Sequence, residues 1–286
     1  MPIESLVYDV GAHRGEDTEF YLNKGFSVIA IEASPNLCSQ LSERFKDHVQ
    51  GGLLKVLNVA IYSATIGEID FYMEDGNTLL STTNLDWVRR NKMSKIVKKI
   101  KVKAMTLNDV MKEHGVPRYC KIDIEGSDLD ALKSLTQNLE LPQFISIESE
   151  RKHWNKLLEE FRTFRALGYS RYKIIDQSLI EFQVCPETSL EGRYFDHRFQ
   201  FGSSGLFGND LPGPWLDALD AIEMYKSIFR GYALNGEENG LFREGGMFNW
   251  LGRIDKAIGR LRGSRTHINP AYILPPPGWY DTHAAR

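Results

Sequence analysis

The sequence predicts an α/β protein built on one mostly parallel sheet. Short apolar runs rich in β-branched residues alternate with amphipathic helical stretches up to about residue 185. Strands separated by helices in this way form parallel sheets that are covered on both faces. With 286 residues, of which 42% are hydrophobic and 26% charged, the chain is long enough for one large domain with an extension.

The expected strands and helices follow one another regularly. The strands lie within residues 5–10, 26–33, 53–62, 119–124, 143–149, 169–176 and 180–185. The helices lie within residues 16–24, 34–46, 106–114, 127–136 and 151–167, and Ser34-Pro35 supplies a cap and a first-turn proline. Only a short turn at Gln177-Ser178 separates the last two strands. We therefore expect a hairpin that ends the sheet in an antiparallel edge strand.

Two segments interrupt this alternation. Residues 67–105 contain strand patterns at 67–73 and 99–104, a polar loop, and eight Lys or Arg residues between Trp87 and Lys103. We interpret this basic stretch as a solvated face or loop in preference to a binding patch. Residues 186–286 hold 14 of the 24 glycines and 7 of the 11 prolines, which predicts irregular backbone with two helices, at 214–230 and 247–262.

These patterns predict a domain at 1–185 and a C-terminal extension at 186–286. The extension either shapes the substrate site as a lid or forms an oligomer contact, and the sequence favours neither clearly. The net charge of −3 argues against a nucleic-acid partner. No basic, apolar leader begins the chain, no apolar run approaches the roughly 20 residues of a membrane span, and the three cysteines are scattered. We expect a cytoplasmic protein.

The first strand leads into a glycine turn, in the segment YDVGAHRG at residues 8–15. Its acidic end is Asp9, and Gly11 and Gly15 permit a tight turn that brings backbone against a ligand. The second strand ends in Glu32, an acid that can accept hydrogen bonds from both hydroxyls of a ribose. This arrangement fits nicotinamide dinucleotides and S-adenosylmethionine alike.

Glycine spacing and charge favour S-adenosylmethionine. A dinucleotide site uses the pattern G-x-G-x-x-G, but His13 and Glu16 stand in the places of the second and third glycines. Glu16 and Asp17 put two carboxylates at the start of the first helix, where they would repel a pyrophosphate. Capping of that helix is the alternative explanation for both. S-adenosylmethionine has no phosphate and is net cationic, so Asp9 beside its amino group is favourable.

A second acidic group follows the strand at 119–124, in the segment KIDIEGSDLDALKSL. Asp123 and Glu125 are two residues apart and point to one side of an extended chain. A carboxylate in an apolar strand is costly unless it is paired or used, so we favour a functional role over capping of the following helix. The next strand ends in Glu148, and His153 follows shortly after it.

Together these segments resemble the FkbM-type methyltransferases. The similarity lies in DVGAHRG, AIEASP, NVAIYSATIG, LLSTTN, TLNDV and above all KIDIEGSDLDALKSL, which fits the family hallmark K-x-D-x-E-G. His13-Arg14 departs mildly from the family turn. The resemblance, over roughly residues 5–150, implies a seven-stranded, Rossmann-like class I methyltransferase fold with S-adenosyl-L-methionine as donor. It also implies O-methylation of a small-molecule or glycan acceptor, commonly a sugar, a glycan or a secondary metabolite.

The same resemblance implies the site residues. Asp123 and Glu125 would face the methyl group and the acceptor. Glu125 is our first candidate for the base, His153 the second, and Asp123 and Glu148 the others. The cofactor-binding residues would be Asp9, Gly11, Ala12, His13, Gly15, Glu32, Ala33, Asn58, Val59, Ala60 and Asp123.

Several alternatives stay open. The sequence shows no fixed metal-ligand spacing, so we expect no metal site, although a divalent ion bridged by Asp123, Glu125 and Glu148 would satisfy the same residues. An NAD-type Rossmann oxidoreductase and a non-catalytic binding protein that retained the methyltransferase fold are the other function classes. The extension could also join two copies of the chain into a homo-oligomer.

Overall fold

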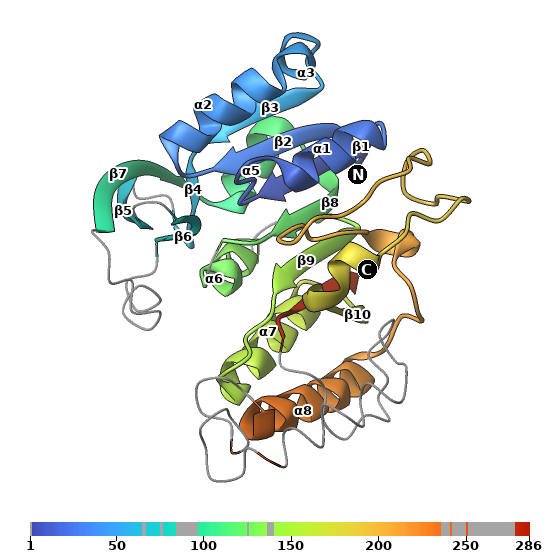
Figure 1. Ribbon diagram of the computed structural model, residues 1–286. Coiled ribbons are helices and arrows are strands. Elements are labelled where there is room, and N and C mark those ends of the chain that lie inside the picture. The colour runs from blue at the N-terminus through green and yellow to red at the C-terminus, as the bar shows by residue number, and fades with distance from the viewer. Residues whose placement is uncertain are drawn as a thin grey trace.

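Seven strands form the central sheet of the computed structural model, which describes residues 2–64, 67–74, 77–83, 97–124, 126–135, 140–235, 241, 250 and 278–286. Their spatial order is β10-β11-β9-β8-β1-β2-β3 (Figure 1). The strands are β1 Ile3–Val10, β2 Ser27–Glu32, β3 Leu54–Asn58, β8 Pro117–Ile122, β9 Phe144–Glu148, β10 Arg171–Asp176 and β11 Tyr280–Ala285. The predicted seven-stranded, mostly parallel sheet is confirmed.

The antiparallel strand comes from an unexpected part of the chain. β11 runs antiparallel to both of its neighbours, β9 and β10. The edge strand β10 therefore pairs antiparallel as predicted, but its partner is β11 and not residues 180–185, so the predicted hairpin is wrong. The side chain of Asp176 accepts hydrogen bonds from the backbone N–H and the hydroxyl of Ser178, at 3.0 and 2.6 Å. These bonds turn the chain into a short 3₁₀ helix, Gln177–Phe182.

Helices cover both faces of the sheet. Side chains of α1 and α2 pack on one face, and α3 follows α2, while α5 to α8 pack on the other face. Their bounds are α1 Glu16–Asn23, α2 Pro35–Arg44, α3 Lys46–Gln50, α5 Leu107–His114, α6 Asp128–Lys133, α7 Trp154–Ala166 and α8 Ala218–Asn235. The caps at Ser34 and Thr106 accept hydrogen bonds from the first turns of α2 and α5.

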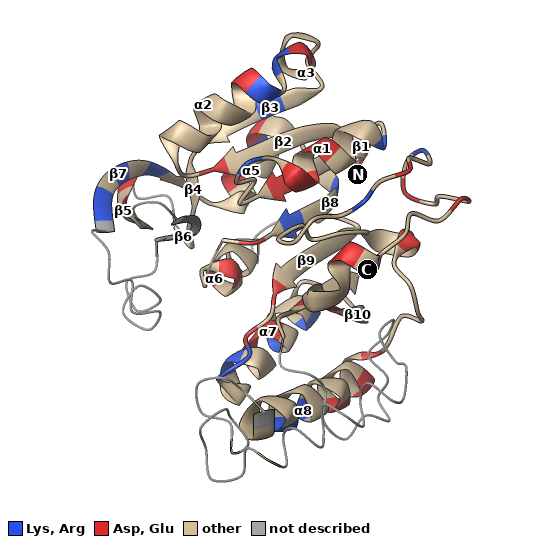
Figure 2. Ribbon diagram, viewed as in Figure 1, with Lys and Arg blue, Asp and Glu red and all other residues tan. Residues whose placement is uncertain are grey.

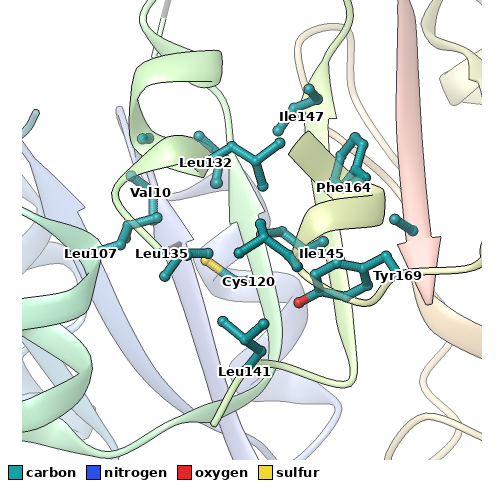
Figure 3. Packing of buried hydrophobic residues seen from close by; sticks show 14 of the residues in the cluster. Val10, Leu107, Cys120, Leu132, Leu135, Leu141, Ile145, Ile147, Phe164 and Tyr169 are labelled. Atoms are coloured by element: carbon teal, nitrogen blue, oxygen red, sulfur yellow. The ribbon is translucent and has the colours of Figure 1, made fainter. Parts of the chain in front are cut away.

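The larger core cluster fills the space between the sheet and α5–α8. Cys120 of β8 and Ile145 of β9 contribute to it from the sheet, and Leu132 of α6 and Phe164 of α7 from the helices (Figure 3). All four side chains are fully buried. Because successive strand residues point to opposite faces, neighbouring positions of the same strands supply the second cluster under α1.

A second, four-stranded sheet is inserted after β3. It contains β4 Ala60–Ile61, β5 Gly67–Glu74, β6 Asn77–Thr82 and β7 Val97–Met105, in the order β4-β7-β5-β6. The strands predicted at 67–73 and 99–104 are confirmed, whereas the loop predicted between them contains β6. Lysines are frequent along β7 (Figure 2), and Lys99 and Lys101, on its outer face, each place Nζ 2.7 Å from a carboxylate oxygen of Asp70. This part of the basic stretch is a solvated face, as predicted.

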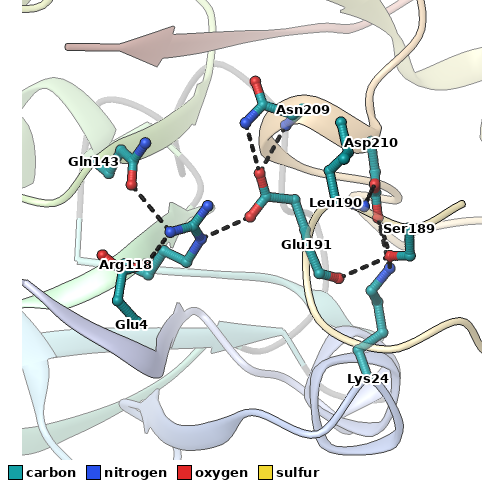
Figure 4. Close-up of polar contacts among 9 residues, drawn as sticks. All are labelled: Glu4, Lys24, Arg118, Gln143, Ser189, Leu190, Glu191, Asn209 and Asp210. Atoms are coloured by element: carbon teal, nitrogen blue, oxygen red, sulfur yellow. Dashed lines mark hydrogen bonds and ion pairs between the residues drawn. The ribbon is translucent and has the colours of Figure 1, made fainter.

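Two ion pairs, each with a buried carboxylate, fix residues 186–211, which we call the strap, beside α1. Lys24 Nζ lies 2.6 Å from Asp210 Oδ2, and both side chains are 1% exposed. Glu191 is fully buried and accepts hydrogen bonds from Arg118 Nε at 2.7 Å and from the backbone N–H of Asn209 at 3.0 Å (Figure 4). Buried charges are costly unless they are paired and hydrogen-bonded, so these contacts hold the strap in one place.

The remainder of the extension differs in part from prediction. α8 begins four residues after the predicted start at 214, so Trp215 lies outside it. Leu219, which we expected on the apolar stripe of this helix together with Tyr225, is 74% exposed, whereas Tyr225 is buried as expected and Ala221 is buried as well. Apart from Trp250, the helix predicted at 247–262 lies outside the described residues, and the domain boundary at 185/186 remains a prediction. Among the helices that the structure describes, none has the length and apolar character needed to cross a membrane.

The buried hydroxyl of Thr282, in β11, should contribute to the stability of the fold. Thr282 is fully buried, and its Oγ1 lies 2.6 Å from Ser149 Oγ and 2.8 Å from Tyr225 Oη. Thr282→Val should lower the free energy of unfolding by about 1–3 kcal/mol, because two buried hydroxyls lose a partner while the shape is kept. Urea denaturation measures this. Exposed Thr188→Val is the control, and equal stabilities of the two variants would contradict the account.

Candidate functional site

A pocket lies at the carboxyl ends of β8, β1, β2 and β3, the edge where open α/β sheets bind ligands. Its lining changes character along the strand order. The β8 and β1 side is charged, Glu32 at the end of β2 lies in the middle, and the β3 side is apolar. The lining residues are Val10, Gly11, Ala12, His13, Glu16, Asp17, Ile31, Glu32, Ala33, Val59, Ala60, Ile61, Phe71, Thr83, Lys121, Asp123, Ile124 and Gly202.

The glycine turn after β1 forms the floor of this pocket. Gly11 has φ +82°, and a Cβ there would come within 1.8 Å of the carbonyl oxygen of Asp123. Gly15 has φ +89°, and a Cβ there would come within 2.5 Å of the ring of Phe45, at the end of α2, and within 2.7 Å of the Leu41 side chain. The two glycines therefore allow the turn to approach β8 and α2 closely. His13, with φ 48°, is the non-glycine residue with a positive φ among those described.

Glu32 holds this turn from the neighbouring strand. Its Oε2 accepts a hydrogen bond from the backbone N–H of His13 at 3.0 Å, and its Oε1 accepts one from Ser34 at 2.8 Å. Burial raises the pKa of Glu32, although these two hydrogen bonds oppose the effect. Each carboxylate oxygen can accept a second hydrogen bond, so Glu32 keeps the capacity to bind hydroxyl donors. The Asn58 amide fixes the adjoining backbone through the carbonyls of Glu32 and Ala33, both at 3.0 Å.

Lys121 is a buried cation at the charged end. Its Nζ lies 3.2 Å from Asp9 Oδ1, 3.2 Å from Asp17 Oδ2 and 3.7 Å from Asp123 Oδ2, and it donates to the carbonyl of Gly11 at 3.3 Å. Burial disfavours the ammonium, but the three carboxylates outweigh burial and raise the pKa of Lys121 well above its usual value. One positive charge thus faces three acids, and the charged end of the pocket is acidic.

Asp17 connects this charged end to the strap. Both of its carboxylate oxygens accept the backbone N–H of Ser204, at 2.9 and 3.1 Å, while Gly202 lines the pocket beside them. Burial, together with the charge of Asp9, raises the pKa of Asp17 to about 6 in spite of Lys121. The first helix and the strap are therefore joined at the pocket itself. Asp9 lies behind them and accepts a hydrogen bond from Thr18 Oγ1 at 2.6 Å.

Three acids extend from the pocket across the sheet, and we call Asp123, Glu148 and Asp281 the carboxylate row. Asp281 pairs directly with Glu148 in the sheet register. Asp123 follows Ile122, which pairs with Ile147, and so it lies opposite Glu148. Burial and the charge of Asp123 raise the pKa of Glu148 to about 7 and that of Asp281 well above its usual value. The row starts in the pocket, at Asp123.

Asp128 shapes the loop between β8 and α6. Its carboxylate accepts hydrogen bonds from the backbone N–H groups of Ile124, at 3.3 Å, and Gly126, at 3.2 Å. Burial, followed by the charges of Asp123 and Glu148, raises the pKa of Asp128 well above its usual value. Thr83 Oγ1 lies 3.0 Å from Ser127 Oγ and brings the end of β6 to the pocket wall.

The structure brings most of the sequence-predicted residues together. Those that line the pocket are Gly11, Ala12, His13, Glu32, Ala33, Val59, Ala60 and Asp123. Asp9, Gly15 and Asn58 lie directly behind the lining and support it. Glu125 lies outside the described residues. His153 precedes α7, half exposed and 3.3 Å from Glu150, and is not part of the lining.

Sequence reasoning missed part of the pocket. Lys121 is the first residue of the K-x-D-x-E-G hallmark, but no role for its positive charge was predicted from the sequence. Phe71 and Gly202 gave no signal, because each reaches the pocket only through the packing of a separate segment. Within the described part of the chain, no cluster of three or more His, Cys, Asp or Glu side chains has the arrangement of a metal site.

The Lys121 cluster generates a stability prediction. Lys121→Met leaves three acids without their cation and should lower the free energy of unfolding at pH 7 by about 3–5 kcal/mol. Part of this loss should be recovered at pH 5. The pKa of Asp17 is about 6 even beside Lys121, which lowers it, so without that cation the carboxylate takes up a proton still more readily in the folded state. Urea denaturation at both pH values measures it, with exposed Lys103→Met as the control. A loss independent of pH would contradict the charge argument.

Comparison with known proteins gives a family and a set of structural neighbours. The model of the methyltransferase FkbM domain matches residues 9–171. No curated protein matches the sequence. A precorrin-6y C5,15-methyltransferase from Geobacter metallireducens is similar with TM-score 0.36 and 9% identity, over 62% of this chain and 69% of that one. A methyltransferase from Thiobacillus denitrificans, solved with S-adenosyl-L-homocysteine, has TM-score 0.35 and 13% identity, over 100% and 87%.

The family match and the sheet agree with each other. The FkbM domain match runs from the end of β1 to the start of β10, and thus includes the glycine turn, Glu32 and the K-x-D-x-E-G segment. The strand order, with antiparallel β11 between β9 and β10, is that of the class I methyltransferase fold. Since the match covers more than half of its residues, the chain belongs to the FkbM family of S-adenosylmethionine-dependent methyltransferases.

Proposed function

We propose that the chain transfers a methyl group to a hydroxyl of a sugar, a glycan or a secondary metabolite. The carboxylate row carries this proposal, because Asp123 belongs both to the row and to the donor pocket. Carboxylates accept hydrogen bonds from hydroxyl groups, and three of them on adjacent strands suit an acceptor with several hydroxyls.

The pocket residues fit S-adenosylmethionine. Asp17 and Asp123 at the charged end favour its ammonium and sulfonium groups, and Lys121 offers a partner for its carboxylate. Glu32 in the middle suits a ribose, and the apolar end suits adenine. A dinucleotide would place its pyrophosphate against Glu16 and Asp17, which supports methyl transfer over the oxidoreductase alternative. When bound, the donor supplies a methyl group on a sulfonium, which is a good leaving group.

The chain's own residues orient the acceptor and accept its proton. The hydroxyl oxygen must be held in line with the methyl carbon and away from water, so positioning supplies much of the rate. A base that takes the hydroxyl proton increases its nucleophilicity. Glu125 remains our first candidate by the family resemblance. Glu148 is the described residue best suited to the same step, because it is partly buried, belongs to the row and has a pKa near 7.

Donor binding and turnover separate the roles of two residues. Asp9→Ala should abolish binding of S-adenosylhomocysteine, because Lys121 and the first turn of α1 lose a common anchor. Glu125→Gln should keep binding and impair turnover. Calorimetry measures binding, and transfer of labelled methyl groups to a panel of sugars and hydroxylated metabolites measures turnover. Exposed Glu187→Gln is the control. Normal turnover in both test variants would refute the assignments.

The same assay distinguishes the remaining alternatives. A non-catalytic protein with this fold would bind the donor and never release S-adenosylhomocysteine in the presence of any acceptor. Transfer to amine compounds, with none to hydroxyl compounds, would keep the methyltransferase activity and reject O-methylation.

The pKa of Glu148 predicts the pH dependence of turnover. A base acts in its deprotonated form, so kcat should rise about tenfold per pH unit below pH 7 and level off above it. Glu148→Gln should remove this inflection and lower kcat, whereas Glu187→Gln should retain it. A pH profile with the same inflection in Glu148→Gln would exclude Glu148 as the titrating group.

A further inference from the structure

Phe71 lies where the inserted sheet meets the donor pocket. It belongs to β5 and is 4% exposed, yet it is one of the lining residues. Its neighbours in the pocket wall are Ala33 after β2 and Val59, Ala60 and Ile61 after β3. All of these side chains are apolar, and Phe71 supplies the phenyl ring among the described lining residues, at the opposite end from the imidazole of His13 and the charged groups.

The pairing of the inserted strands explains how this ring reaches the pocket. β4 follows β3 directly and pairs with β7, which pairs with β5, so the small sheet is attached beside the carboxyl end of β3. Ile69 and Phe71 point to its inner face, where Val102 is the register partner of Ile69 and Ile100 that of Phe71. Asp70 and its lysine partners point outward into solvent. The alternation of β5 thus directs one aromatic side chain to the donor site.

The order of the pocket wall identifies the ligand group that meets Phe71. The charged end lies at β8 and β1, and Glu32 lies between that end and Phe71. A ligand with a charged amino-acid end, a ribose and a heterocyclic base, placed with its ribose at Glu32, brings its base to the apolar end. Aromatic rings stack on such bases through their flat faces, without hydrogen bonds.

We propose that Phe71 forms the adenine-binding wall of the donor pocket, so that the inserted sheet is part of the donor site. This inference rests on the proposed donor site and adds a residue and an element outside the central sheet. Small side chains at Ala33 and Ala60 leave room for a planar group against the Phe71 ring. The inserted sheet then contributes to donor affinity and not only to the surface of the protein.

Calorimetric titration with S-adenosylhomocysteine tests the proposal. Phe71→Leu keeps a buried apolar side chain and removes the ring, and it should weaken binding roughly tenfold or more. Ile69→Ala is the matched control, because Ile69 lies on the same face of β5 and in the same cluster but does not line the pocket. Its affinity should stay within about threefold of wild type, even where its melting temperature falls as much as that of Phe71→Leu.

A second ligand shows which part of the donor Phe71 contacts. The Phe71→Leu substitution should weaken the binding of adenosine by the same factor as it weakens the binding of S-adenosylhomocysteine. Equal affinities of Phe71→Leu and wild type, or an equal loss in Ile69→Ala, would overturn the proposal. A wild-type chain that binds neither ligand would reject the donor site and this inference with it. A wild-type chain that binds both but transfers no methyl group would contradict the proposed function and leave the role of Phe71 intact.

Discussion

The buried ammonium of Lys121 is the interaction on which the arrangement of the site depends. It is the point where β1, α1 and β8 meet, through Asp9, Asp17 and Asp123. Without it, three acids would face one another in a low-dielectric environment, at a cost that burial and repulsion both increase. With it, the glycine turn approaches β8 so closely that Gly11 has no space for a side chain. The same ion cluster therefore sets both the shape and the acidity of the pocket.

Two segments outside the central sheet are attached to the site in different ways. The strap is fixed by the pairs of Lys24 with Asp210 and of Arg118 with Glu191, and it meets α1 again where Ser204 donates to Asp17. The inserted sheet is attached differently, by strand pairing and a small apolar cluster. The strap places Gly202 at the charged end of the pocket, and the inserted sheet places Phe71 at its apolar end. The pocket is thus assembled from three regions of the chain.

The sequence was informative wherever a local rule determines the structure. Alternating apolar runs located six of the seven central strands, and caps such as Thr106 located helices. The glycine turn and the end of β2 identified pocket residues, because carboxyl ends of neighbouring parallel strands meet at one edge. Residues 180–185 have a strand-like composition, but Asp176 caps a turn and leaves Phe182 and Val184 exposed, at 60% and 78%. β11, Phe71 and Gly202 depend on contacts between distant segments, which no local pattern reports.

The place of β11 has a consequence for the order of folding. β9 and β10 run in the same direction, and the strand that separates them lies far along the chain, so that Ser149 must find Thr282 across 133 residues. Closing such a loop costs entropy before any contact repays it, which makes this pairing a late event. Until then β9 and β10 present compatible edges to each other and can pair as neighbours. If β9 and β10 paired in this way, the six-stranded, wholly parallel sheet would have to reopen before β11 could enter, and that reopening would slow the completion of the sheet.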